Sequence, residues 1–542
     1  MKRFVDLAKL FGLWTVPIIL WGGAYAFMKF HPNKSVSKLE WLILILICFV
    51  CCLFIWNKND IRIRNGKSLE DIGFLDFLSN KVEAYDVNDG KSSFTHPQIK
   101  NEMLFDNPAE TSFILGKTNI RGKIKWVGIP KNSTNNHVLI SGGSGSGKSS
   151  CQIIPNLLLR QARAKLGNGA NYLVLDPKGE LYKKTGITTG NNPDIAFSPA
   201  DRNCYGYDPL YLLNESSSEQ EIYNCAFVIA NSLIPKPNKK SGDNGPWIVL
   251  AQSMLVGFIL YCYKYKKIVY LPNIVQYIIS NPMEEILKEA CTNVGETSIV
   301  RMSLQQFVGM SQETLYSVTA TLFPRIKSFA LDADLVWSLS NNPRKFRMDD
   351  LLFSSVFINI PLDKITKYAS LIFLFINQFA NWVYTLPENH TRENNRELVL
   401  IIDETTAIFE ELGDIPAEYK QLLRYGRSFG VSVVTAVQSI SGLKTLMDDD
   451  SVNDVLSNMA FKLYLDCTAE TDRLISSVGK FRAKKVSYNK EGEKTESFEL
   501  EDLLTPKEAC ELGQSDELIC ISNLGYFRFK KAPYYKEKIF FE

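Results

Sequence analysis

Two long uncharged runs of hydrophobic residues lie near the start of the chain. Residues 10–28 contain nineteen residues without a charge, and residues 41–57 contain seventeen. As α-helices these runs would measure about 28 Å and about 25 Å, close to the hydrocarbon thickness of a bilayer. Trp41 and Trp56 lie near the ends of the second run, where indole rings favour the headgroup region. We therefore predict two transmembrane helices within an anchor domain of residues 1–58.

Two alternatives for these runs are a pair of buried core helices and a cleaved signal peptide. The second run is hydrophobic on every face, which disfavours an ordinary core helix. Ala24–Ala26 resembles a cleavage site, but the first run is long for a signal peptide and a second run follows directly.

Short hydrophobic runs of strand length recur further along the chain. They are HVLI from His137, LVLD within Asn171–Tyr182, SSVFINIP from Ser354, LVLII from Leu398 and VSVVTAVQS from Val431. Buried parallel strands give such continuous hydrophobic runs, so an α/β fold is predicted.

A helical pattern separates these strands. Lys148 lies shortly after the strand from His137, and Asp403 directly follows the strand from Leu398. The two residues are 255 positions apart, and hydrophobic residues at helical spacing fill much of the interval. We predict an inserted all-α domain at 211–345, between two parts of a nucleotide-binding domain at 59–210 and 346–542. The hydrophobic stretch 256–267 is not predicted as a third span, because lysines interrupt it.

The loop after the first strand matches G-x-x-x-x-G-K-[ST]. Glycines let backbone N–H groups curl round phosphates, Lys148 offers a cation to the β/γ oxygens, and the Ser149 hydroxyl can bind Mg²⁺. The alternative is a Gly/Ser-rich linker, which the flanking strand and helix patterns disfavour. The predicted nucleotide-binding residues are Gly142, Gly143, Ser144, Gly145, Ser146, Gly147, Lys148, Ser149 and Ser150.

An acidic pair follows the strand at 398–402. We predict that Asp403 holds Mg²⁺, through water, and that Glu404 polarises the water that attacks ATP. Taken alone the pair could equally be a solvated strand end, but with the phosphate loop it indicates a hydrolytic site.

Two further residues are candidates for coupling and catalysis. Gln438 follows the strand from Val431 and is placed to sense the γ-phosphate. Arg424 and Arg427 precede that strand, and Arg427 could reach a neighbouring subunit's γ-phosphate as an arginine finger. A surface arginine is the alternative for Arg427.

The charge distribution limits how nucleic acid could bind. The net charge is +2, but residues 1–58 hold seven Lys/Arg and two Asp/Glu, which leaves 54 basic and 57 acidic residues, or −3, elsewhere. Nucleic acid would therefore bind to local basic loops. Residues 481–494 form a Lys-rich hairpin or loop, for which a solvated turn is the favoured interpretation, and residues 527–538 suggest a terminal strand. The eleven scattered cysteines suggest reduced thiols.

The orientation of the spans follows from nucleotide chemistry. The loop between the spans carries lysines too, so the positive-inside signal is weak. ATP is available on the cytoplasmic side, so a multi-pass protein of the cytoplasmic (inner) membrane with both termini in the cytoplasm is predicted.

The ordered motifs resemble one family. HVLISGGSGSGKSS, LVLDPKGELY, YDPL, GPWIVLAQ, LIIDET and GRSFGVSVVTAVQS are similar to those of type IV coupling proteins, the TraG/TraD group of conjugative transfer and type IV secretion systems. The resemblance implies a membrane-anchored, RecA-like ATPase that forms a homohexamer and uses ATP and Mg²⁺. It implies that a relaxase–single-stranded DNA complex is delivered to the secretion channel, that Gln438 couples hydrolysis to movement, and that Arg427 is the inter-subunit finger.

Other functions stay open from the sequence. A coupling ATPase could export protein effectors without DNA, and a membrane receptor could bind nucleotide as a switch without pumping. Glu404 disfavours the receptor, which needs no water-activating carboxylate. A chromosome-partition translocase is a neighbouring possibility, but no basic recognition helix follows residue 500 in the sequence pattern.

Overall fold

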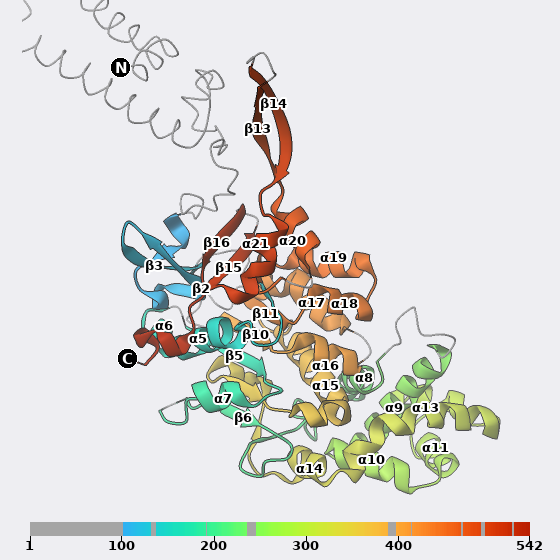
Figure 1. Cartoon of the computed structure of the whole chain (residues 1–542). Helices are drawn as coiled ribbons and strands as arrows, with labels where there is room; N and C mark the ends of the chain where they lie inside the picture. Colours follow the sequence, from blue (N-terminus) through green and yellow to red (C-terminus); the bar gives the residue numbers. More distant parts are fainter. Residues whose placement is uncertain are drawn as a thin grey trace, which may run out of the picture. The chain divides into compact units, whose positions relative to one another are not determined.

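The structure of the protein is a computed structural model (Figure 1). It describes residues 101–541, apart from 132–136, 168, 191, 236–244, 388–396, 413–414, 468–469, 489–493 and 523–524. The predicted membrane spans at 10–28 and 41–57 therefore lie outside the described residues. The described residues form two units, a small one of residues 475–506 and a large one of residues 101–474 with 507–541.

The large unit is built on a sheet that has twelve strands among the described residues, in the order β1-β3-β2-β16-β15-β12-β4-β11-β10-β5-β9-β6. The run from β12 to β6 is parallel. Its strands are β4 (Val138–Ser141), β5 (Ala170–Leu175), β6 (Ile195–Phe197), β9 (Val356–Ile358), β10 (Glu397–Ile402), β11 (Val431–Val437) and β12 (Phe461–Tyr464). They are buried on both faces almost throughout, as expected of parallel strands. The predicted α/β fold class is confirmed.

An antiparallel extension completes the sheet, and the sequence pattern did not predict it. It contains β1 (Leu104–Phe105), β2 (Thr111–Ile120), β3 (Lys123–Pro130), β15 (Glu517–Ser522) and β16 (Gly525–Lys530). Arg121 and Gly122, with φ of 52° and 82°, make the tight turn between β2 and β3. The terminal strand predicted at 527–538 is present only in part, as β16, because the chain leaves the strand after Lys530 and forms a 3₁₀ turn at Tyr534–Lys536. β16 pairs with β2 through Lys530 and Lys117.

Helices cover the sheet on its two faces (Figure 1). They include α7 (Glu180–Thr185), α15 (Ile365–Val383), α16 (Thr405–Leu412), α17 (Ala417–Tyr425), α18 (Ile440–Leu446), α19 (Asp449–Asn458) and α21 (Pro506–Glu511). The helix predicted after the phosphate loop is instead divided into the π-helical turn η5 (Lys148–Ile153), α5 (Ile154–Leu158) and α6 (Arg160–Lys165). Pro155 contributes to this division, because it has no N–H to give to an α-helical ladder.

A helical region lies between β7 (Gly206–Tyr207) and β8 (Lys345–Phe346), inside the predicted insertion. Its main helices are α8 (Glu219–Leu233), α9 (Gly245–Lys264), α10 (Leu271–Ser280), α11 (Met283–Thr292), α12 (Ile299–Leu304), α13 (Gln312–Leu331) and α14 (Ala333–Val336). β7 and β8 pair in parallel, so the chain leaves and re-enters the core at one place. The helical character is thus as predicted, while the domain boundaries stay predictions.

Helix α9 is the centre of this region and packs against α8, α10, α12 and α13. A Cβ at Gly257 would come within 2.4 Å of Leu304 Cδ2, so glycine permits the close approach of α9 and α12. By length and composition α9 could cross a membrane, but 67% of its apolar window is buried within the protein. That burial is the behaviour of a core helix.

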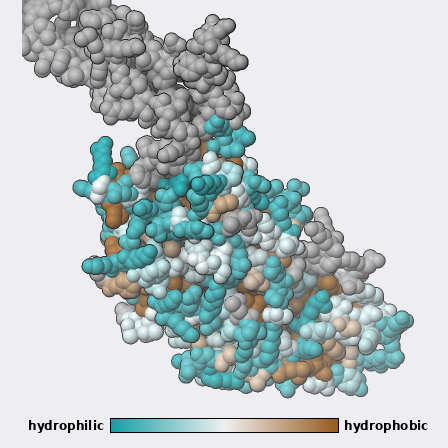
Figure 2. Space-filling model, in the orientation of Figure 1, coloured by the Kyte–Doolittle hydropathy of each residue, from teal (hydrophilic) through white to brown (hydrophobic). Residues whose placement is uncertain are grey.

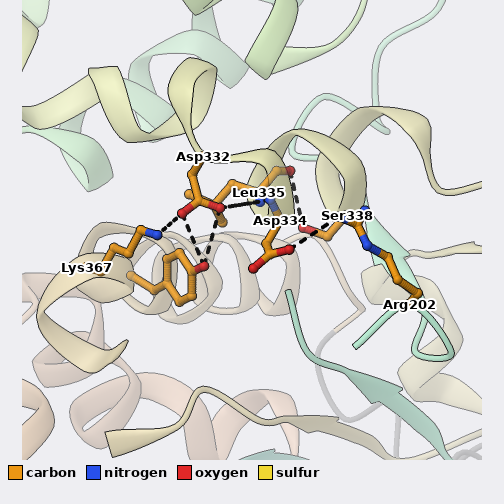
Figure 3. Close-up of polar contacts among 7 residues, drawn as sticks. Arg202, Asp332, Asp334, Leu335, Ser338 and Lys367 are labelled. Carbon is orange, nitrogen blue, oxygen red and sulfur yellow. Dashed lines mark hydrogen bonds and ion pairs between the residues drawn. The ribbon is translucent and has the colours of Figure 1, made fainter. Parts of the chain in front are cut away.

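The last turn of the helical region is tied to the core by charged contacts (Figure 3). Asp332 caps α14 by accepting from the N–H groups of Asp334 and Leu335 at 2.9 and 3.0 Å. The same carboxylate forms an ion pair with Lys367 of α15. Arg202, from the loop before β7, pairs with Asp334 at 3.2 Å. These contacts fix the exit of the helical region against the core.

The small unit contains a two-stranded antiparallel ribbon. Strands β13 (Lys480–Tyr488) and β14 (Lys494–Asp502) pair from Lys480 opposite Asp502 to Tyr488 opposite Lys494. The Lys-rich segment predicted at 481–494 is therefore part of a hairpin. The favoured interpretation of this segment as a solvated turn stays a prediction.

Candidate nucleotide-binding site

The loop between β4 and η5 has the backbone shape of a phosphate cradle. Gly145 and Gly147 have φ of 79° and 100°, which a residue with a side chain rarely adopts. A Cβ at Gly147 would lie 2.7 Å from Cys151 Sγ, so this position has no room for a side chain. The loop is tied to the sheet by the Gly142 N–H, which donates to the Val437 carbonyl at 3.2 Å. Successive backbone N–H groups in such a loop form a concavity suited to an anion.

Lys148 projects from the start of η5 back towards the loop. Its side chain is buried, and Nζ donates to the Gly142 carbonyl at 2.7 Å and the Gly143 carbonyl at 3.3 Å. Burial lowers the pKa of Lys148. A buried ammonium held by carbonyl oxygens of the phosphate loop is well placed to bind the β- and γ-phosphates of a nucleotide.

Ser149 and Asp403 meet across the site, although 254 positions separate them. Ser149 Oγ donates to Asp403 Oδ2 at 3.3 Å. Asp403 is fully buried at the end of β10, and its own N–H donates to the Leu175 carbonyl of β5 at 3.2 Å. A hydroxyl and a carboxylate are oxygen ligands of the kind that Mg²⁺ prefers, so the donor set fits this ion. Burial, and then the neighbouring Glu404 carboxylate, raise the pKa of Asp403 to about 6.

Glu404 is the one residue of the site whose backbone is strained. Its φ is 54°, in the left-handed region that a residue with a side chain adopts at a cost of roughly 1–3 kcal/mol. Its N–H donates to Asp403 Oδ1 at 3.1 Å, which fixes the turn between the two carboxylates. The strained turn directs the two side chains from adjacent positions into different surroundings.

The Glu404 carboxylate accepts hydrogen bonds from two side chains. Lys178 Nζ lies 2.5 Å from Oε1, and Gln438 Nε2 lies 3.2 Å from Oε2. Burial acts to raise the pKa of Glu404, but the hydrogen bonds from Lys178 and Gln438, together with the charges of Lys148 and Lys178, lower it overall. The structure thus brings the predicted Gln438 and Glu404 together, and it adds Lys178.

Lys178 was absent from the site residues predicted from the sequence, although its motif was noted. Strand β5 pairs in parallel with β10, with Leu175 opposite Ile402, so the residues after each strand leave the same edge of the sheet. This shared edge is the signal that the sequence carried, because DPKGELY and the acidic pair both follow predicted strands. Asp466, which follows β12, is a second addition. A Cβ at Gly143 would lie 2.9 Å from its Oδ2.

The two predicted arginines lie away from the site of their own chain. Arg424 is on α17 and pairs with Asp454 of α19 at 2.7 Å. Arg427 is exposed on the short 3₁₀ turn η11 (Gly426–Phe429), which directly precedes β11. Gln438 follows the other end of β11, and seven strand residues span about 23 Å. Arg427 is therefore at the opposite edge of the sheet from Lys148.

These features define an α/β protein of the P-loop class, with the loop and an acidic pair at the carboxyl ends of parallel strands. Residues 91–542 match the family described as "Type IV secretory system Conjugative DNA transfer". The chain belongs to this family, and the resemblance drawn from the motifs is confirmed.

Solved structures of the bacterial conjugative coupling protein TrwB share the fold. The TrwB complex with the non-hydrolysable ATP analogue ADPNP matches with a TM-score of 0.59 at 17% identity, covering 81% of this chain and 92% of that chain. An unbound form of TrwB lacking its N-terminal segment matches with a TM-score of 0.58 at 17% identity, covering 77% and 88%. A complex of TrwB with ADP and Mg²⁺ matches with a TM-score of 0.53 at 17% identity, covering 81% and 92%. No curated protein matches this sequence.

Proposed function

We propose that this protein is a membrane-anchored ATPase that couples a DNA-processing complex to a conjugation channel. The observation that carries the proposal is the approach of Ser149 and Asp403 to 3.3 Å, which assembles a metal-binding pair beside the phosphate loop. Membership of a conjugative DNA transfer family supports a role for this ATPase in DNA transfer. The TrwB structures with a nucleotide analogue and with ADP and Mg²⁺ support ATP and Mg²⁺ as its ligands.

The residues of the site would divide the work of hydrolysis. Lys148 and the loop N–H groups would hold the phosphates, and Ser149 and Asp403 would hold Mg²⁺. The ion would supply charge neutralisation at the transferring phosphoryl group. Glu404 would orient and polarise the attacking water, and Gln438, already bonded to Glu404, would transmit the state of the γ-phosphate to the strand β11 that precedes it.

Arg427 would act in a neighbouring subunit. Its place about one strand length from the phosphate loop of its own chain argues against a role there, and supports a ring in which it completes the next site. A homohexamer anchored by the spans 10–28 and 41–57, with both termini in the cytoplasm, is the proposed assembly.

The proposed cargo is a relaxase carrying single-stranded DNA, which would be received at the helical region and passed to type IV secretion channel proteins. On the face drawn in Figure 2 the large unit is mainly hydrophilic, with hydrophobic areas at the helical region and also on the side where β2 and β3 lie. Large exposed hydrophobic side chains on the helical region include Met302, Tyr316 and Leu331.

An ATPase assay of the detergent-extracted full-length protein, with and without single-stranded DNA, tests the proposal. We expect hydrolysis by the protein, and stimulation by DNA that weakens steeply as salt increases from 50 to 200 mM, because phosphate contacts release counterions. Hydrolysis without any response to DNA at low salt would favour the export of protein effectors alone. Binding of ATP without hydrolysis under any condition would favour a nucleotide-binding receptor.

A further inference from the structure

The carboxylate of Glu404 is held from two sides, by two side chains that are themselves exposed. Lys178 Nζ is 2.5 Å from one oxygen, and Gln438 Nε2 is 3.2 Å from the other. The Glu404 side chain is 8% exposed, whereas that of Lys178 is 38% exposed. The ammonium is thus the charged partner of a nearly buried carboxylate and reaches it from the solvent side.

The backbone that presents Lys178 is built as a rigid turn. Asp176 is fully buried, and its Oδ2 accepts from the N–H groups of Leu181 and Tyr182 at 2.8 and 3.3 Å, at the start of α7. Gly179 has a φ of 63°, and a Cβ there would lie 2.6 Å from Asn359 Nδ2. Lys178 lies between these two fixed points. Its ammonium therefore projects from a fixed Cα towards the end of β10.

Glu404 needs such a partner for physical reasons. It follows Asp403 directly, so two carboxylates share one end of a strand, and its own backbone is in a strained conformation. Without Lys178 the carboxylate would keep only the longer hydrogen bond, from Gln438 Nε2 at 3.2 Å, and could turn from the orientation in which it meets water. A misplacement of about 1 Å at a reacting group can cost about a hundredfold in rate.

We propose that Lys178 is a positioning residue that acts on hydrolysis through Glu404, by holding the carboxylate in the orientation in which it polarises the attacking water. The inference rests on the proposed ATPase function. In this role Lys178 contributes orientation to the chemical step and leaves the affinity for nucleotide to Lys148 and the phosphate loop.

The test compares steady-state ATPase kinetics of the full-length protein in detergent. We expect Lys178→Ala to lower kcat by about 10- to 100-fold while KM and the Kd for the ATP analogue ADPNP change by less than about threefold, because only the orientation of the base is lost. Lys178→Met, which keeps most of the stem and removes the charge, should be as slow as Lys178→Ala. Lys178→Arg should recover part of the rate, since a guanidinium also donates to a carboxylate.

A double-mutant cycle with Glu404→Gln shows whether Lys178 acts through Glu404. If it does, Lys178→Ala should slow the Glu404→Gln protein by less than about twofold, because the partner is already lost. Lys183→Ala, an exposed lysine on the following helix α7, is the matched control and should leave kcat unchanged.

Three results would overturn the inference. These are a wild-type kcat for Lys178→Ala, a loss of ADPNP affinity as large as that of Lys148→Ala, and an undiminished effect of Lys178→Ala on Glu404→Gln. A failure of the proposed function is seen separately, because the wild-type protein itself would then hydrolyse no ATP in the same assay.

Discussion

The two ends of the parallel strands carry different kinds of residue. At the carboxyl ends of β4, β5 and β10, buried charged groups converge, namely Lys148, Asp176, Asp403 and Glu404. At the amino ends, His137 is buried before β4, where its Nδ1 accepts from the Val433 N–H at 2.9 Å, and Arg427 is exposed before β11. One edge holds several ionisable groups out of water, whereas the other holds a neutral imidazole and leaves its arginine at the surface.

This difference indicates that the carboxyl edge binds a ligand and that the amino edge is suited to contact another molecule. Buried charges are expensive unless a partner or ligand compensates them, so their concentration at one edge is typical of a ligand site. In open α/β sheets ligands bind outside the carboxyl ends of the strands, which is the edge with these charges. The amino edge presents Arg427, an exposed cation suited to contact another molecule. The same strands thus separate the two halves of a site that we propose is completed between subunits.

The largest expected effect comes from removing the cation of the carboxyl edge. Lys148→Ala should reduce DNA transfer from donor to recipient cells by at least about 100-fold, because it removes the buried ammonium that lies on the Gly142 and Gly143 carbonyl oxygens of the phosphate loop. Membrane insertion, measured by fractionation, should be unchanged. Lys165→Ala, an exposed lysine on α6, is the control and should transfer normally. Normal mating by Lys148→Ala would remove the nucleotide site from the mechanism.

The carboxyl edge was largely predictable from the sequence because its signals are local. Each parallel strand is a buried hydrophobic run, and the phosphate loop, the acidic pair and Gln438 directly follow such runs. The Lys178 contact with Glu404 was not predicted, because it joins residues 226 positions apart. It follows only when β5 and β10 are known to be neighbours.

The rest of the fold depends on pairings without a local signal. The antiparallel extension joins β2 to β16 through residues more than 400 positions apart, and no periodicity reveals such a partner. The helices of the insertion were predictable from their hydrophobic spacing. The π-helical turn after the phosphate loop was not, since helical periodicity alone does not distinguish it from an α-helix.

The proposed role of Arg427 in a neighbouring subunit is tested by mixing two variants that are each expected to be inactive. Arg427→Ala keeps its phosphate loop and lacks the arginine, while Lys148→Ala has the reverse defect. In a ring of randomly mixed subunits roughly a quarter of the sites would pair an intact loop with an intact arginine, so about that fraction of ATPase activity should return. Arg424→Ala, whose arginine pairs with Asp454 within the chain, should stay active by itself. If no ratio of the two proteins restores hydrolysis, Arg427 does not complete a neighbouring site.

The smallest expected effects are on the pH dependence of the free energy of unfolding. They should have opposite signs for His137 at the amino edge and for Asp403 at the carboxyl edge. Burial, and then Arg427, lower the pKa of His137 from 6.5 to about 4, so the unfolded chain binds more protons between these values. The stability that neutral, buried His137 contributes to the free energy of unfolding is therefore present above pH 6.5 and is lost as the pH falls towards 4. For Asp403, whose pKa is raised from 3.8 to about 6, the contribution is present below pH 3.8 and is lost as the pH rises through 6.

Thermal unfolding of the protein between pH 4 and 7, with chelator and without nucleotide, separates these two groups. His137→Asn keeps an acceptor near the position of Nδ1 but does not titrate. The wild type should therefore lose stability relative to this variant as the pH falls, by up to about 3 kcal/mol, or a few degrees in Tm. Relative to Asp403→Asn the wild type should instead gain stability as the pH falls, by a similar amount. Melting curves that shift in parallel for all three proteins would mean that neither edge holds its ionisable group as the structure describes. The claim that the two edges hold ionisable groups in different electrostatic surroundings would then be contradicted.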